Sequence, residues 1–213
     1  AGTDLVRTDL VLRAVDLTRM LRLLMPDERE VGGLLSLMLL TDARRETRTD
    51  STGRLLLLEE QDRSRWDRAA IDEGQRIVGD LLRGGPVGRF TLQAAIAAEH
   101  ARATSYDVTD WSRLLQLYDA LLRVWPTPVV VLNRAVVLAM VDGPAAALEV
   151  VDGLVSAGKL SGYRYLPATR ADLLRRLGRG AEAADAYRST LDLAENEAER
   201  QFLTRRLGEI SGD

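Results

Sequence analysis

Apolar residues recur about every 3.6 positions through nearly the whole chain, and few stretches alternate apolar and polar residues. An α-helix places residues three and four apart on one face, whereas a half-buried strand alternates with a period of two. The pattern therefore predicts an all-α protein. Composition agrees with a packed fold, since 46% of the 213 residues are hydrophobic and 29% are charged.

Prolines, glycines and capping residues divide this pattern into about ten helical segments. The first segment ends at Pro26, and its apolar stripe consists of Leu10, Ala14, Leu17, Leu21 and Leu24. The second contains Gly32-Gly33, a pair that is unfavourable in a helix interior and indicates a close approach to another helix. Later breaks are expected at residues 84–86, 104–109, 125–127, 142–144, 161–162 and 178–180, and Asn196 with Glu199 resembles the capping box of a tenth helix.

Residues 48–63 form the expected connector between the second and third helices. They combine turn-forming residues with four leucines and a dense charged cluster. Ser64 and Asp67 resemble a capping box, and a buried stripe is expected to comprise Trp66, Ala70, Ile77 and Leu81. One interpretation is a tethered loop that crosses the core, with its arginines paired to carboxylates. The alternative is the rim of a ligand or partner site, formed by Gln61, Asp62, Arg63, Arg65 and Trp66.

A weak internal repeat occupies the last hundred residues. Segments 143–149 (GPAAALE) and 178–187 (GRGAEAADAY) begin about 35 residues apart, near the ~34-residue period of tetratricopeptide repeats. Such repeats stack helical hairpins, so that neighbours bury faces that no single hairpin could bury. We therefore expect one all-α domain over residues 1–213. Antiparallel helical hairpins are expected over 1–105, and a tetratricopeptide-like right-handed α-solenoid over 106–213.

The charge pattern argues against direct DNA binding by this domain. The chain has 29 basic and 32 acidic residues, a net charge of −3, and no basic stripe. Cysteine is absent, which excludes disulfides and thiolate chemistry and fits a cytoplasmic location. No apolar run approaches the ~18 residues that suggest a membrane-spanning helix, so no membrane association is expected.

The sequence favours a protein that is not an enzyme and that uses neither cofactor nor metal. His100 is the single histidine, and a lone histidine without cysteine does not make a usual zinc site. Glu99 beside it points to another side of the helix, so it would not orient His100 as a general base. Residues 84–88 (GGPVG) lack the lysine of a phosphate-binding loop, and no G-x-S-x-G motif is present. A structural or surface histidine is the preferred interpretation.

Binding residues are expected on the concave surface of the repeats. Asn133 and Arg134 lie in the first helix of one repeat, and Arg170 lies in that of another. An amide offers a donor and an acceptor, and a guanidinium binds carboxylates in a bidentate manner, so the set suits a peptide backbone or a carboxylate. The alternative is that Asn133 caps a backbone group and Arg134 pairs locally.

Six stretches of the chain, taken in order, carry a resemblance to a known family: LMLLTDARR (37–45), LLLLEEQDRSRWD (55–67), LQAAIAAEHA (92–101), TDWSRLLQLYDALL (109–122), PVVVLNRAVVLAM (128–140) and ADLLRRLGR (171–179). They resemble the long C-terminal extension of a subgroup of bacterial extracytoplasmic-function sigma factors. The resemblance implies a role in transcription initiation. The implied partners are the sigma factor's own N-terminal domains, core RNA polymerase or a separate regulator.

A second hypothesis from another class is a helical domain that senses a small molecule. In that case the cluster 61–66 would converge on one pocket with Gln93, His100 and Asn133. A closed cavity lined by these residues would favour the sensor, and a scattered arrangement would favour protein binding.

Overall fold

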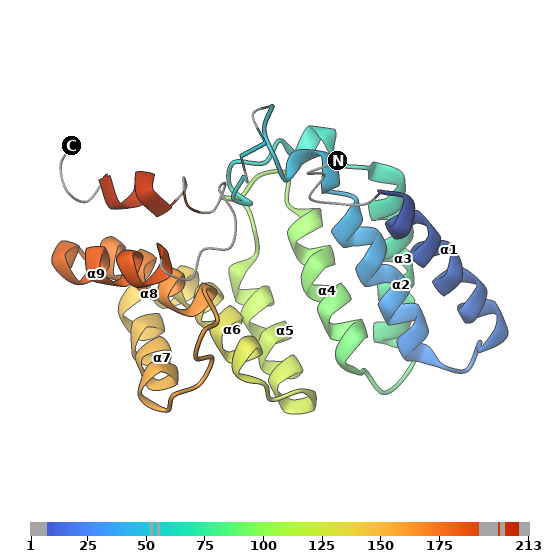
Figure 1. Cartoon of the computed structure of the whole chain (residues 1–213). Helices are drawn as coiled ribbons and strands as arrows, with labels where there is room; N and C mark the ends of the chain where they lie inside the picture. The colour runs from blue at the N-terminus through green and yellow to red at the C-terminus, as the bar shows by residue number, and fades with distance from the viewer. Residues whose placement is uncertain (1–7, 52, 55, 192–199, 201–202, 209–213) are drawn as a thin grey trace. The chain divides into compact units, whose positions relative to one another are not determined.

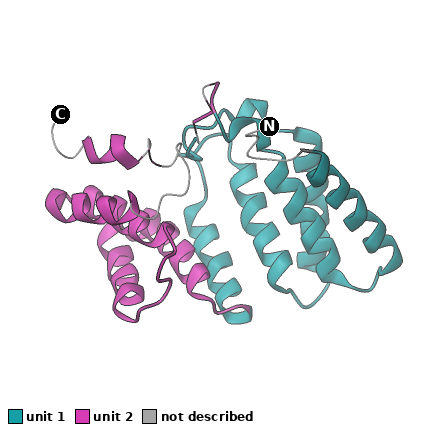
Figure 2. Cartoon of the chain, in the orientation of Figure 1, with its two compact units in different colours: residues 1–49, 56–124 teal, residues 50–55, 125–213 magenta. Residues whose placement is uncertain are grey.

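The computed structural model describes residues 8–51, 53–54, 56–191, 200 and 203–208. These residues form α-helices, two short 3₁₀ helices and connecting turns, without a β-strand, as the apolar period predicts (Figure 1). They divide into two compact units, one of residues 1–49 and 56–124 and the other of residues 50–55 and 125–213 (Figure 2). This boundary falls later than the expected change from hairpins to repeats at residue 105. Each unit is described separately below.

Unit 1 contains five helices among the described residues, and α2, α3 and α4 pack against one another. Its elements are α1 (Thr8–Leu24), α2 (Arg29–Asp42), η1 (Arg45–Thr47), η2 (Arg63–Arg65), α3 (Arg68–Arg83), α4 (Arg89–Arg102) and α5 (Trp111–Val124). α1 packs on α2, and α5 packs on α4. Unit 2 contains α6 (Pro128–Val141), α7 (Pro144–Ser156), α8 (Tyr165–Arg176) and α9 (Gly180–Leu191), each packed against the next.

The close approach predicted for the glycine pair occurs at Gly33, where α2 meets the start of α4. A Cβ atom at Gly33 would lie 2.6 Å from both the backbone nitrogen and the hydroxyl of Thr91. Glu30, one turn earlier, accepts hydrogen bonds from the Phe90 N–H (2.7 Å), the Thr91 N–H (3.2 Å) and the Thr91 hydroxyl (2.7 Å). Its carboxylate therefore satisfies donors at the positive end of α4.

The contact of α2 with α3 is equally tight and is centred on Gly74. A Cβ atom there would lie 2.7 Å from Leu40 Cγ, and the buried Ser36 hydroxyl donates to the Gly74 carbonyl at 2.7 Å. Leu35 and Ile77 are buried in the adjoining core. A small residue, a buried hydroxyl and an apolar cluster together fix how these two helices pack.

The capping box predicted at Ser64 is wrong. Ser64 lies in η2, where Asp62 is the N-cap and accepts from the Ser64 N–H at 3.0 Å. α3 starts later, at Arg68, and its N-cap is Asp67, which accepts from the Ala70 N–H at 3.1 Å. Two Asx caps close together thus replace one capping box, and the chain between them is extended enough to bury Trp66 outside the helix.

The breaks predicted before α6 and α7 and after α8 occur in unit 2, whereas α8 starts at Tyr165, three residues after the predicted start at Gly162. Thr127 caps α6 by accepting from the Val130 N–H at 3.4 Å, and proline follows as the first helical residue. Gly143 and Gly178 have φ angles of +90° and +73°, a region that glycine adopts without steric cost, and they precede α7 and follow α8. Asn196 and Glu199, expected to cap a tenth helix, lie outside the described residues.

Candidate functional site

The apolar stripe predicted for the first helix does not face the core. Leu10, Leu17 and Leu24 are 48%, 66% and 77% exposed, and Ala14 and Leu21 on the same side are exposed too. We call these five residues the apolar face of α1. The side of α1 that packs on α2 instead carries Val15, which is 5% exposed, and Thr18.

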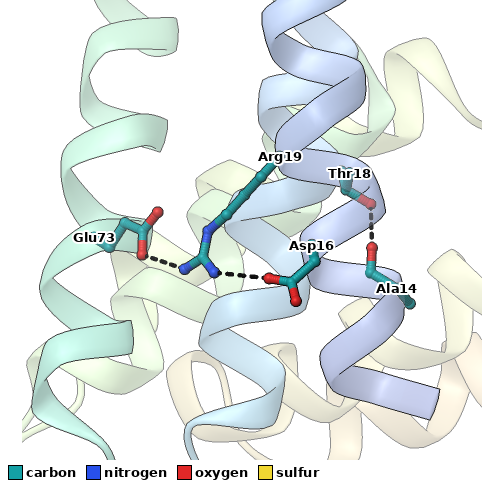
Figure 3. A network of polar contacts seen from close by, with 5 residues as sticks. All are labelled: Ala14, Asp16, Thr18, Arg19 and Glu73. Atoms are coloured by element: carbon teal, nitrogen blue, oxygen red, sulfur yellow. Dashed lines mark hydrogen bonds and ion pairs between the residues drawn. The ribbon is translucent and has the colours of Figure 1, made fainter. Parts of the chain in front are cut away.

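Polar contacts fix this orientation of α1. Figure 3 shows Arg19 of α1 reaching Glu73 of α3, with an Nη2–Oε2 distance of 2.8 Å, while Asp16 lies 3.4 Å from Nη1. The buried Thr18 hydroxyl donates to the Ala14 carbonyl at 2.8 Å and contacts the sulfur of Met38 at 3.5 Å. Rotating the leucines inward would break these contacts, so they are held on the solvent side.

In the connector, Arg63 is the residue most strongly built into the structure. Its side chain is 5% exposed, and Nη1 donates to the carbonyls of His100 and Ala103, both at 2.7 Å. These carbonyls end α4, where unsatisfied acceptors and the negative end of the helix dipole favour a cation. Arg63 is therefore paired with a helix end. The expectation that a carboxylate pairs with it is wrong.

Trp66 lies beneath two guanidinium groups. The Cζ atom of Arg63 is 5.0 Å from the centre of its ring, and that of Arg44 is 5.7 Å away. The buried indole N–H donates to the Thr47 hydroxyl at 2.9 Å, which donates in turn to the Arg44 carbonyl at 3.0 Å. The two cation–π contacts and the hydrogen-bond chain join η1 to the connector.

His100 completes this cluster from α4. Its ring makes an edge-to-face contact with Trp111, with centroids 5.9 Å apart. Burial, followed by the positive charges of Arg44 and Arg63, lowers the pKa of His100 to about 4. The imidazole is therefore neutral at physiological pH, which supports the structural interpretation over a catalytic one.

The remaining connector residues have local roles. Gln61 donates from Nε2 to the Leu56 carbonyl at 3.2 Å. Asp62 holds η2, and its bonds to Ser64 lower its carboxyl pKa. Arg65 is exposed. Of the five predicted rim residues, only Arg63 and Trp66 are buried, and Arg63 donates to the His100 carbonyl.

Gln93 lies about two turns before His100 on α4, and its amide donates to the Arg89 carbonyl of the same helix at 3.2 Å. In unit 2, Asn133 is exposed on α6, and Arg134 beside it is half-buried. Arg170 of α8 pairs with Asp152 of α7, with an Nε–Oδ1 distance of 2.7 Å. Gln93 therefore bonds within its own helix, and Arg170 forms an ion pair with a carboxylate of the neighbouring helix.

Sequence reasoning did not place Arg44 beside Trp66. Burial first, and then the charges of Arg48 and Arg63, lower the pKa of Arg44. The sequence signal for this concentration of charge is three arginines within five positions, Arg44, Arg45 and Arg48. Within the described ranges, no three histidine or carboxylate side chains are placed to hold a metal ion, and no helix is long and apolar enough to cross a membrane.

The chain is similar in sequence to a protein family of unknown function and to an uncharacterized protein. Residues 1–81 match the family described as "Family of unknown function (DUF6596)". An uncharacterized protein of Rhizobium meliloti (strain 1021), R00370, is 41% identical over 212 residues. The alignment covers 100% of this chain and 50% of that protein, so the chain spans about half the length of its curated relative. No solved structure matches the chain.

Proposed function

We propose that this chain is a regulatory, protein-binding domain of an extracytoplasmic-function sigma factor. It modulates transcription initiation by contacting the sigma factor's own N-terminal domains, core RNA polymerase or a separate regulator. The transcriptional part of the proposal rests on the resemblance of stretches such as LLLLEEQDRSRWD, at residues 55–67. The binding part rests on the apolar face of α1.

That face has the properties of a protein contact surface. Leucines predominate along about four turns of one helix. Fully burying an exposed leucine side chain is worth roughly 1.5–3 kcal/mol, and these partly exposed leucines would gain a share of that. Contiguous exposed apolar patches on soluble proteins mark interaction sites. The buried residues Val15 and Thr18 and the ion pair of Arg19 with Glu73 fix α1 to the rest of unit 1, so the apolar face lies on a helix of fixed orientation. A partner that covers it would shift the balance between engaged and disengaged states.

Unit 2 supplies a second surface in this proposal. Helices α6 to α9 pack in sequence order, and we propose that they form a tetratricopeptide-like right-handed solenoid whose concave side binds extended peptide. Asn133 is exposed on α6, and we propose that its amide donates to and accepts from the peptide backbone.

The test measures binding of the purified chain to the sigma factor's N-terminal domains and to core polymerase. Leu17→Asp places a charge in the apolar face of α1, where the side chain is 66% exposed, so the fold should tolerate it. We expect affinity to fall at least about tenfold, because a hot-spot leucine contributes more than about 1.4 kcal/mol. Val155→Asp is the control, since it also replaces an exposed apolar side chain with aspartate, at a 47% exposed position of α7.

Equal loss in both variants would contradict a specific role for the apolar face of α1. An Asn133→Ala variant tests the solenoid surface independently, and unchanged affinity would remove that residue from the proposal. Initiation from the cognate promoter that is equal with and without this domain would refute the regulatory role itself.

A further inference from the structure

Three guanidinium groups gather at one end of unit 1, and we call Arg44, Arg48 and Arg63 the arginine cluster. Arg44 and Arg63 share Trp66 as a cation–π partner, at 5.7 and 5.0 Å. Arg48 is exposed and follows Arg44 by four residues, and its charge lowers the pKa of Arg44. Like charges so close together repel one another, and the repulsion grows as they are withdrawn from water.

Several carboxylates close in sequence are engaged elsewhere, and Glu46 of η1 is exposed. Asp42 pairs with Arg45 at 2.5 Å, Glu99 pairs with Arg102 at 3.4 Å, and Asp62 and Asp67 cap η2 and α3. Within the described ranges, no carboxylate lies within ion-pair distance of Arg44, Arg48 or Arg63. The cluster therefore concentrates positive charge that the described chain does not neutralise.

Two buried polar atoms in the cluster also lack hydrogen bonds. They are Nη2 of Arg63, a residue that is only 5% exposed, and Nδ1 of His100, and neither has a partner among the described residues. A buried group that gives up water without a replacement partner costs stability, and more so when it is charged. Such an arrangement is typical of a site whose counter-charge comes from a ligand.

We propose that the arginine cluster binds the phosphate group of a small molecule. The half-buried Arg44 and the exposed Arg48 donate hydrogen bonds to the phosphate oxygens. The buried Arg63 contributes a further positive charge to the site. A guanidinium held over an indole keeps its in-plane N–H groups available for a bidentate contact. Phosphate is favoured over a single carboxylate because it offers at least three acceptor oxygens to several donors and because its esters carry a charge of about −1.5 to −2 at pH 7. This inference does not depend on the sigma-factor role proposed above.

His100 offers a direct readout, because it is the chain's single histidine and its ring Cε1–H resonance is unambiguous. Inorganic phosphate is titrated into the whole chain at constant ionic strength, and the pH titration of this resonance is repeated at each concentration. We expect the pKa of His100 to rise saturably from about 4, by about one unit, because an anion in the cluster offsets the arginine charges. Phosphate should also raise the thermal midpoint.

Arg44→Gln and Arg48→Gln each remove one proposed phosphate donor and should weaken phosphate binding at least tenfold. Arg48 is exposed, so its variant should fold normally, which circular dichroism checks. Arg65→Gln is the matched control, because it removes the same charge from an exposed neighbour of the cluster and should leave binding unchanged.

Absence of a saturable shift, or equal weakening in the Arg65→Gln control, would overturn the inference. Succinate that binds as tightly as phosphate would overturn the assignment to phosphate. Glycerol 3-phosphate distinguishes the source of the group: tighter binding than inorganic phosphate assigns the site to a phosphate ester, and equal binding assigns it to the free ion.

Discussion

Replacing Gly33 with alanine tests the geometry on which unit 1 depends. The substitution adds one methyl group inside α2, where the start of α4 leaves no room. The new Cβ would lie 2.6 Å from the Thr91 nitrogen and 3.0 Å from the Phe90 carbonyl carbon. Ordinary carbon contacts are about 3.5–4.0 Å long, so α2 and α4 must separate by roughly 1 Å. Backbone atoms are involved, and rotation of a side chain cannot relieve the clash.

Two opposing terms set the magnitude of this effect. Alanine is about 1 kcal/mol more favourable than glycine inside a helix. Overpacking costs about 1–3 kcal/mol. The same displacement lengthens the contacts of Glu30 with the Thr91 N–H and hydroxyl, now 3.2 and 2.7 Å, and each is worth about 1.5–3 kcal/mol as a hydrogen bond to a charged group. We therefore expect a net destabilisation of about 1–3 kcal/mol.

Urea unfolding followed by circular dichroism measures this change, and Gly79→Ala is the control. At Gly79 in α3 the nearest atom to a new Cβ is the flexible end of Arg83, at 3.5 Å. That variant should be stabilised by about 0.5–1 kcal/mol through helix propensity alone. A Gly33→Ala protein as stable as the Gly79→Ala protein would refute the close approach of α2 and α4.

Three further predictions concern individual polar groups. Glu30→Gln removes the charged acceptor at the start of α4 and should lower the free energy of unfolding by about 1–3 kcal/mol, measured in urea. The contribution of neutral His100 to stability should be complete above pH 6.5 and should be lost, by roughly 3 kcal/mol, as pH falls to about 4, because the unfolded chain binds the proton first. In a His100→Asn variant the free energy of unfolding should not show this dependence on pH. Thr47→Val should cost about 1–3 kcal/mol by leaving the Trp66 N–H without its acceptor, and Thr47→Ser should restore most of that stability.

The helical architecture was predictable because its signals are local. Proline at the first position of α6 and glycine with positive φ before α7 act within a few residues, so periodicity and break residues suffice to find them. Ser64 shows where local signals become ambiguous. Its sequence context fits a capping box as well as Asp62 and Asp67 fit single N-caps. The burial of Trp66 between the two aspartates decides which residues cap the helices. That burial depends on Thr47, far back in the sequence.

The cluster around Trp66 was predictable only in part, for the same reason. Arg63 and Trp66 stand out in sequence because charge and aromatic area occur together in a short connector. Their partners come from η1 and from the end of α4, and no spacing rule connects those segments. The carbonyls of His100 and Ala103, which receive Arg63, carry no sequence signal, because every residue has a carbonyl.

The first helix shows a different limit, since its apolar stripe was found from the pattern but does not face the core. Leucines along one side of α1 indicate a surface that avoids water, but the pattern does not say which surface covers it. Within unit 1 the core takes the opposite side, with Val15 and Thr18, and Arg19 secures that choice through Glu73 (Figure 3). The exposed leucines of α1 support the proposal that a partner covers this side of the helix, which is why the binding test begins at Leu17.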